Sequence, residues 1–397
     1  MHEHVAAISD VALRGPDASG CLSVSERGAD LLFLTWMPAP MAPVDLDAAR
    51  AYVAIDAALR ERAAVPLLER VFVTLAAMPC VRRGRMRAVG GREEWDVPPT
   101  VVQGTPIHGG SGFAGIHVLA VRGARGAVRA LCHRGQVRGR VVEARNARFV
   151  GLSDTGQCAA RRARGPADDT TAAIATAETL LDAEGMSFGD VARTWFYLRD
   201  ILDWYDDFNA ARNDAFRRMR LAGHGILPAS TAIGGQAPGD GWCALDLLAA
   251  RPNDGGELEM RRLHNRRQNE ATEYGSAFAR GVSLTVGGFR YLFVSGTASI
   301  DERGATIHAG DFAAQLRRTV ENVAALLESE GASLSDLRQV TAFVKKTSDV
   351  PAYERMAIDT GLADVPSIAT LADVCRDDLL FELDATAIVP DPRGHPR

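Results

Sequence analysis

"TLLDAEGMSFGDVARTWFYLRD" (residues 179–200) is matched by "ALLESEGASLSDLRQVTAFVKK" (residues 325–346). Each segment reads as the end of an amphipathic helix, an acidic residue followed by glycine, a short turn and a β-rich run. The predicted strands are residues 194–198 and 340–344. Because the matching features are equally spaced in both segments, these segments are two copies of one internal repeat.

The repeat continues downstream and has a third, more divergent copy. "PASTAIGGQAPGDGWCALDLLAA" from Pro228 and "PSIATLADVCRDDLLFELDATAI" from Pro366 align without a gap. Near the front of the chain, residues 45–62 predict an amphipathic helix and residues 70–75 the strand after it. "PTVVQGTPIHGGSGFAGIHVLAV" from Pro99 then supplies the final strands. The opening strands of the three copies are predicted at residues 31–36, 147–153 and 290–299.

The three copies define the predicted architecture. Each copy reads as two strands, a helix, a strand and two final strands, which indicates an α+β fold in which helices cover one face of a mixed sheet. We expect the copies to pack as a pseudo-trimer within one chain. The predicted organisation is a degenerate repeat at 1–125, a linker at 126–147, a second repeat at 148–251, a linker at 252–268, a third repeat at 269–390 and a tail at 391–397.

A carboxylate stands inside the final strand of the third copy. In "LLFELDATAI", residues 379–388, Glu382 interrupts an apolar run that suits a covered strand. Counted from the three prolines, Gly115, Ala244 and Glu382 occupy one equivalent position. Since two copies have a small residue there, Glu382 indicates a functional site placed on one copy. The alternative is a glutamate on an edge strand facing water, or one paired with Arg376.

Composition argues against several classes of function. The formal net charge of -5 disfavours nucleic acid or an anionic membrane surface as the main partner. The sequence has no apolar stretch long enough to span a bilayer and no pattern typical of a secretory signal, so we expect a cytoplasmic protein. HExxH and CxxC patterns are absent, which predicts no metal site and reduced thiols. The six cysteines are Cys21, Cys80, Cys132, Cys158, Cys243 and Cys375.

Several motifs resemble a known superfamily. "YLFVSGTASI" (291–300), the turn and strand of residues 330–346, and "FELDATAI" (381–388) are similar to the RidA superfamily, whose members are usually homotrimers with ligand clefts between subunits. Within it, "ARTWFYLRDILDWYDDFNAARNDAF" (192–216) and "ADVCRDDLLFELDA" (372–385) resemble the chorismatases. These enzymes remove the enolpyruvyl group of chorismate as pyruvate.

The resemblance implies roles for two residues. In chorismatases, the glutamate of the matching strand protonates the enolpyruvyl methylene, which implies that Glu382 is a general acid acting without a cofactor. Physics supports this role, because burial on an apolar strand raises the pKa of a carboxyl group toward a useful value. Cys375 matches a cysteine near the ring in the chorismatases that form 3-hydroxybenzoate, which implies that product. A lone cysteine is otherwise a small core residue.

A dianionic substrate such as chorismate also requires cationic and hydrogen-bonding groups. Arg280 and Arg376 are the candidates for holding carboxylates, and Gly296 for allowing a close approach of ligand or backbone. The further candidate donors are Tyr274, Ser276, Thr297 and Lys345. For each, the alternative is a structural role in a salt bridge, strand or cap. The aromatic residues of the second copy are expected in the core, or as one wall of the cleft: Trp195, Tyr197, Trp204 and Tyr205.

Two other functions stay open. Deaminating members of the RidA superfamily carry an arginine just after the last proline, where this chain has Ser367 and Ile368, which argues against an imine or enamine hydrolase. A non-catalytic protein that binds a small ligand is the second alternative, against which the glutamate of the third copy argues. We expect a small anionic partner, and a monomeric pseudo-trimer or a weak homo-oligomer.

Overall fold

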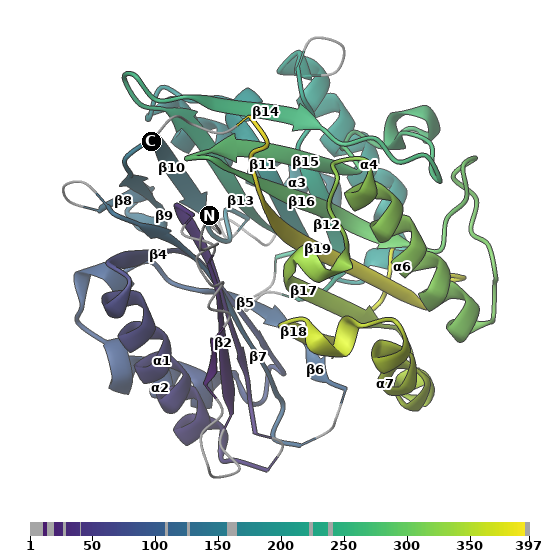
Figure 1. Ribbon diagram of the computed structural model, residues 1–397, viewed down its shortest axis with the longest axis horizontal. Helices are drawn as coiled ribbons and strands as arrows, with labels where there is room; N and C mark the ends of the chain where they lie inside the picture. The colour runs from purple at the N-terminus through teal and green to yellow at the C-terminus, as the bar shows by residue number, and fades with distance from the viewer. Residues whose placement is uncertain are drawn as a thin grey trace, which may run out of the picture.

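The computed structural model describes residues 11–13, 20–26, 29–39, 41–107, 110–124, 128–156, 165–221, 225–236 and 241–393. Within these residues the chain forms three mixed β-sheets and six α-helices, so the fold class is α+β (Figure 1). Cys158 and residues 394–397 of the predicted tail lie outside the described residues. None of the described helices is both long and apolar enough to cross a membrane.

The first sheet has the strand order β1-β2-β3-β7-β4-β5. Its strands are β1 (Val11–Leu13), β2 (Cys21–Ser25), β3 (Leu31–Met37), β7 (Phe113–Arg122), β4 (Ala64–Val73) and β5 (Thr100–Gln103). The helices α1 (Val44–Glu61) and α2 (Met78–Val89) lie side by side on one face of this sheet (Figure 1). Ala51 and Ile55 of α1 share a buried cluster with Val118 of β7, so the apolar stripe of the helix faces the sheet.

The second sheet has the order β12-β11-β13-β10-β9-β8. Its strands are β12 (Ala229–Gly234), β11 (Val191–Leu198), β13 (Cys243–Pro252), β10 (Ala147–Leu152), β9 (Gln136–Glu143) and β8 (Arg129–His133). Its helices are α3 (Pro166–Asp182) and α4 (Ile201–Arg218). Ile174 of α3 and Phe208 of α4 are buried in one cluster with Phe196 of β11.

The third sheet has the order β14-β15-β16-β19-β17-β18-β6. Its strands are β14 (Leu258–Arg262), β15 (Gly281–Val286), β16 (Phe289–Ala298), β19 (Phe381–Pro390), β17 (Leu337–Val344), β18 (Ser367–Leu371) and β6 (Thr105–Pro106). Its helices are α6 (Phe312–Glu328) and α7 (Val350–Asp359). The short strand β6 belongs to the first copy in sequence but pairs with β18. Short 3-10 helices are η1 (Glu93–Trp95), η3 (Phe188–Asp190), η4 (Ala271–Tyr274), η5 (Leu334–Asp336), η6 (Thr347–Asp349) and η7 (Leu362–Asp364).

One strand order recurs in all three sheets, as the sequence repeat predicts. The opener, final strand, strand after the helix and proline strand are neighbours as β3-β7-β4-β5, β10-β13-β11-β12 and β16-β19-β17-β18. In each set the last pair is parallel and the other pairs are antiparallel. The strand after the helix carries a register shift in every copy, between Pro66 and Leu68, Val191 and Arg193, and Leu337 and Gln339. Such a conserved bulge is consistent with three copies of one unit.

Both predicted linkers contain strands instead. Residues 126–147 include the hairpin β8–β9, which extends the second sheet, and residues 252–268 include β14, which pairs with β15. Arginine and glycine in these segments read as loop, but Arg140 is buried and donates a hydrogen bond to the carbonyl of Pro66. Arg140 therefore lies at a boundary between units rather than on a solvated connection.

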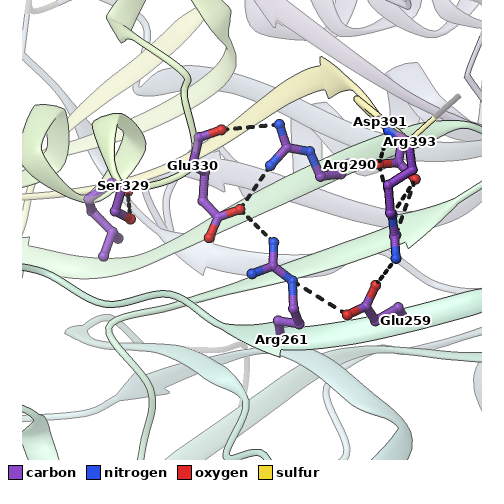
Figure 2. A network of polar contacts seen from close by, with 8 residues as sticks. Glu259, Arg261, Arg290, Ser329, Glu330, Asp391 and Arg393 are labelled. Atoms are coloured by element: carbon purple, nitrogen blue, oxygen red, sulfur yellow. Dashed lines mark hydrogen bonds and ion pairs between the residues drawn. The ribbon is translucent and has the colours of Figure 1, made fainter.

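The acidic residue and glycine of the repeated turn anchor these added strands. Gly331 has φ +68° and ends α6 in the left-handed conformation that favours glycine. The carboxylate of Glu330 accepts hydrogen bonds from Arg261 of β14 at 2.7 Å and Arg290 of β16 at 2.9 Å (Figure 2). In the second unit, Glu184 pairs with Arg129 of β8 at 2.5 Å. The turn thus joins the helix end to the outer strands in both units.

The faces of the sheets turned away from the helices share one central core. It includes Phe33 of the first unit, Phe149 and Trp195 of the second, and Tyr291 and Phe293 of the third. This cluster consists of residues from strands and loops, whereas the helices pack in three outer clusters. The three sheets therefore bury their inner faces against one another, which creates interfaces where side chains of two units meet.

Candidate active site

A cavity of about 390 Å³ lies between the second and third units. The second unit contributes α4 and β12, and the third contributes β16, β19 and the segment before each of β15 and β19. Its lining residues are Leu202, Asp203, Trp204, Tyr205, Asp206, Asp207, Asn209, Arg212, Ser230, Ala232, Ser276, Phe278, Arg280, Gly296, Ala298, Ile300, Cys375, Arg376, Asp377 and Glu382. Six of the sequence-predicted site residues are among them: Ser276, Arg280, Gly296, Cys375, Arg376 and Glu382.

Glu382 is a buried residue of a central strand. β19 lies between β16 and β17, so the edge-strand alternative is wrong. The residue is 4% exposed and pairs with Phe343 of β17. Gly115 and Ala244 pair in the same way with Phe72 and Tyr197, as expected for equivalent positions.

The role of Gly296 follows from its contact with Glu382. A Cβ atom built on Gly296 would collide with Oε1 of Glu382. The register between β16 and β19 shifts between Val294 and Thr297, so Gly296 lies in an irregular stretch of the strand. A glycine at this position leaves space for the carboxyl group beside the neighbouring strand.

The surroundings of Glu382 favour its protonated form. Burial, together with the negative charge of Asp384, raises the pKa of this carboxyl group to about 8. The positive charges of Arg193 and Arg280 oppose this effect. At neutral pH the side chain therefore holds a proton that it can donate, as a general acid requires.

Two buried arginines flank the same phenylalanine. The guanidinium group of Arg280 lies 5.6 Å from the ring of Phe278, and that of Arg212 lies 5.3 Å from it. Arg212 reaches this position from α4 of the second unit, where its Nη2 also donates to Asn209 at 2.7 Å. Arg280 is 2% exposed and Arg212 is 1% exposed. Both charges are held in fixed places, which suits recognition of an anion.

Arg376 and Cys375 lie on the segment that precedes β19. Nη1 of Arg376 donates to the carbonyl of Gly304 at 2.9 Å and to Thr306 at 3.4 Å. Burial raises the pKa of the Cys375 thiol to about 12, and the charge of Glu382 acts in the same direction. Cys375 therefore lines the cavity as a neutral thiol and is a poor nucleophile.

Two of the predicted donors lie outside the cavity, and the structure does not describe the side chain of a third. The hydroxyl of Thr297 donates to the carbonyl of Ser295 at 2.8 Å, and Thr297 is not among the described lining residues. The same holds for Lys345, whose Nζ donates to the carbonyls of Arg376 and Asp377 and so supports the cysteine-bearing segment. Tyr274 ends η4, and its side chain lies outside the described part of the chain.

The sequence offered aromatic residues of the second copy as an alternative wall of the cleft, but it did not identify the polar residues of that wall. Arg212 and Asn209 of α4, and Ser230 of β12, belong to another unit than Glu382. The available signal was an arginine on an apolar helix face, between Phe208 and Phe216. Of the aromatic residues, Trp204 and Tyr205 line the cavity, whereas Trp195 and Tyr197 are buried in the central core.

Comparisons with known proteins identify the relatives of this chain. The Ribonuc_L-PSP family, described as endoribonuclease L-PSP, matches residues 277–389, which is the third unit. A 3-hydroxybenzoate synthase of Streptomyces hygroscopicus is 32% identical over 248 residues, covering 55% of this chain and 69% of that protein. The chain belongs to the chorismatase family. A chorismatase of Streptomyces rapamycinicus is 30% identical over 240 residues, covering 54% of this chain and 68% of that protein.

A solved chorismatase structure shows the same fold. It superposes with a TM-score of 0.57 and 21% identity, and the match covers 81% of this chain and 93% of the other. The similarity therefore extends beyond the third unit, to which the endoribonuclease L-PSP match is confined. Membership of the chorismatase family is consistent with a cavity that two units build jointly.

Proposed function

We propose that this protein is a chorismatase-like enzyme that converts chorismate into pyruvate and a hydroxybenzoate, namely 3-hydroxybenzoate. The observation that carries the proposal is the buried carboxyl group of Glu382, whose pKa is raised to about 8. It lies in a cavity that Arg212 and Arg280 also line. Relatives named 3-hydroxybenzoate synthase and chorismatase support the assignment.

The proposed chemistry begins with proton transfer to carbon. Glu382 donates its proton to the terminal methylene of the enolpyruvyl ether, and positive charge develops on the neighbouring carbon that bears the ether oxygen. The neighbouring ring hydroxyl then gives up its proton and attacks the ring carbon that bears the ether oxygen, so the ether bond to the ring breaks, pyruvate leaves and an epoxide forms. The epoxide opens with its oxygen kept on that ring carbon, and the hydrogen of that carbon is lost as a proton while the oxygen gains one, which gives 3-hydroxybenzoate. Formation of 3-hydroxybenzoate consumes no net water, whereas a dihydrodiol product consumes one water molecule. The reaction needs no oxidant or reductant, and we propose that it needs no cofactor.

Arg212 and Arg280 are the proposed carboxylate-binding residues. They approach Phe278 from different units, so a dianionic substrate between them would bridge the interface. Arg376, Ser276 and Gly296 are proposed to complete the binding surface because they line the same cavity. Cys375 is proposed to contact the ring as a neutral thiol. Thr297 and Lys345 are proposed as supports rather than contacts, and Tyr274 stays a predicted hydrogen-bond donor.

The three units are proposed to form an intrachain pseudo-trimer. Their shared strand order and common central core support this arrangement. We propose unit boundaries near those predicted, with the second unit beginning at the β8–β9 hairpin and the third at β14. The active site then belongs to one of the three interfaces, because Gly115 and Ala244 replace the acid in the other units.

Incubation of the purified chain with chorismate tests the proposed function. The wild-type chain is expected to release pyruvate and 3-hydroxybenzoate in equal amounts, detected by an enzyme-coupled pyruvate assay and chromatography. Glu382→Gln keeps the size of the side chain but removes the acid, so release is expected to fall about 100-fold or more. No pyruvate from a folded wild-type chain would reject chorismate as the substrate. A rate equal to wild type in the variant would reject Glu382 as the acid.

A further inference from the structure

A second buried carboxylate lies on the same strand face as Glu382. Asp384 follows Glu382 by two positions on β19, so both side chains point to the same side of the sheet. Oδ2 of Asp384 accepts a hydrogen bond from Thr231 of β12 at 3.1 Å and lies 3.3 Å from Nη2 of Arg193 of β11. The side chains of Arg193 and Asp384 are 1% and 7% exposed. This charge pair therefore crosses the same interface as the cavity.

Arg193 is held firmly in place. Its Nη2 donates to Thr231 at 2.5 Å, and its guanidinium group lies 4.7 Å from the ring of Trp195. Arg70 of the first unit lies 4.3 Å from the same ring and donates to Gln339 of the third. Nη1 of Arg193 is a buried atom without a hydrogen-bond partner among the described residues. Burial of an ion pair has a large desolvation penalty, so this pair indicates a role other than stabilising the fold.

The pair is specific to the interface that contains the cavity. Arg193 is the first paired residue after the register shift of β11. The equivalent positions after the shifts of β4 and β17 hold Leu68 in the first unit and Gln339 in the third. Neither of these carries a charge. Glu382 is likewise present in one unit only. Two charged features that the repeated fold does not require thus meet at a single interface.

We propose that Asp384, held in place by Arg193, is a positioning residue that keeps the Glu382 carboxyl group protonated and directed into the cavity. The inference rests on the proposed function, because it assigns a task to the proposed acid. The anion of Asp384 opposes ionisation of Glu382, and Arg193 balances that anion and fixes its place through a shared contact with Thr231. A Cβ atom built on Gly296, the residue that leaves space for the acid, would lie 3.3 Å from Cγ2 of Thr231.

Other ionisable groups line the same cavity as Glu382. They are Arg280 before β15, Arg212, Tyr205 and the aspartates 203, 206 and 207 on α4, and Cys375, Arg376 and Asp377 before β19. These groups are unchanged when Asp384 is replaced, so their influence is common to wild type and variant. The residues of β12 and β16 in the cavity are uncharged.

The test compares Asp384→Asn with Asp246→Asn. Asp246 is the equivalent residue of the second unit, is fully buried, and accepts hydrogen bonds from Thr100 at 2.5 Å and the amide of Asp154 at 2.9 Å. The ionisation of Glu382 is followed in the ligand-free chain by infrared spectroscopy of its carboxyl band, with the spectrum of Glu382→Gln subtracted. Asp384→Asn is expected to shift the titration to lower pH by ~1 unit, and Asp246→Asn to leave it unchanged.

Kinetics provide the second measurement. The decline of kcat with rising pH is expected to move to lower pH in Asp384→Asn by the same amount as the infrared titration. If that variant does not fold, the double variant Asp384→Asn with Arg193→Met removes both members of the buried pair. It is expected to show a smaller shift in the same direction, because Asp384 raises the pKa of Glu382 by more than Arg193 lowers it.

An unchanged Glu382 titration in the folded Asp384 variant, or an equal shift in Asp246→Asn, would overturn the inference. Failure of the proposed function gives a different pattern. In that case, wild type releases no pyruvate from chorismate, while the infrared titration of Glu382 still shifts in Asp384→Asn.

Discussion

Gly296 of β16 lies so close to Glu382 of β19 that a methyl group on Gly296 would overlap the Oε1 atom of the carboxyl group. The two residues come from strands that are hydrogen-bonded neighbours, and the register between them is irregular at this point. The glycine and the acid therefore form one structural feature. A buried carboxyl group on a central strand requires space that the neighbouring strand must leave.

Gly296→Ala is expected to displace the Glu382 carboxyl group and lower kcat about 100-fold, because small displacements of a proton donor are costly to catalysis. Gly225→Ala is the matched control, since a Cβ there meets only Leu221 at 3.5 Å and beyond. The measurement is the initial rate of pyruvate release, with thermal unfolding to verify folding. Full activity in Gly296→Ala would show that the carboxyl group is not confined by this contact.

The raised pKa of Glu382 predicts how stability depends on pH. In the folded chain the pKa is about 8, against 4.5 for an exposed glutamate. Between these values the folded chain holds a proton that the unfolded chain releases, so the contribution of Glu382 to stability is complete below pH 4.5 and is lost as pH rises through 8. Relative to Glu382→Gln, wild type is expected to lose about 1.4 kcal/mol of unfolding free energy per pH unit in this window.

Urea unfolding of wild type and Glu382→Gln at a series of pH values measures this difference. The unfolding free energy of wild type minus that of Glu382→Gln is expected to fall from pH 5 to pH 8 and then level off. A constant difference across the series would mean that the folded chain does not raise the pKa of Glu382. The same ionisation predicts that kcat declines above pH 8, since the acid then loses its proton.

The repeat and the strand that carries the acid were predictable from sequence because each depends on local pattern. Gly296 was expected to admit a ligand or a backbone, and in the structure it makes room for the Glu382 carboxyl group. The repeat fixes which residues are equivalent, so Glu382 stands out against Gly115 and Ala244. The wall formed by Arg212 was not predictable in this way, because it comes from a different unit about 170 residues earlier in the chain. Patterns within one segment carry no information about which faces of two units meet.

The linker predictions failed for a related reason. Arg140 is buried at a boundary between units, where its guanidinium group bonds to a backbone carbonyl. Charged residues on strands usually indicate a solvated face, so a strand that is covered by another unit reads as a loop. The same effect concealed Arg193, which the sequence places in an apolar strand and the structure places against Asp384.

Arg212→Lys is expected to weaken substrate binding, because lysine cannot form the planar, two-pronged contact of a guanidinium with a carboxylate. The expected change is a rise of about 10-fold or more in KM for chorismate, with a smaller change in kcat. Arg217→Lys, on the same helix but with a side chain that is 72% exposed and paired with Asp214, is the control and is expected to match wild type. An unchanged KM in Arg212→Lys would remove this residue from the binding site.

The network around Glu330 is expected to affect stability without affecting catalysis. Its carboxylate, whose side chain is 8% exposed, binds Arg261 and Arg290 and so joins the end of α6 to β14 and β16 (Figure 2). Glu330→Ala leaves the largely buried charge of Arg290 without its carboxylate partner and is expected to cost about 1–3 kcal/mol of unfolding free energy. The exposed neighbour Glu328→Ala is expected to cost almost nothing. Equal stability of the two variants in urea unfolding would show that the network contributes no more than an ordinary surface charge. A loss of kcat in folded Glu330→Ala would show that β14 and the cavity are coupled.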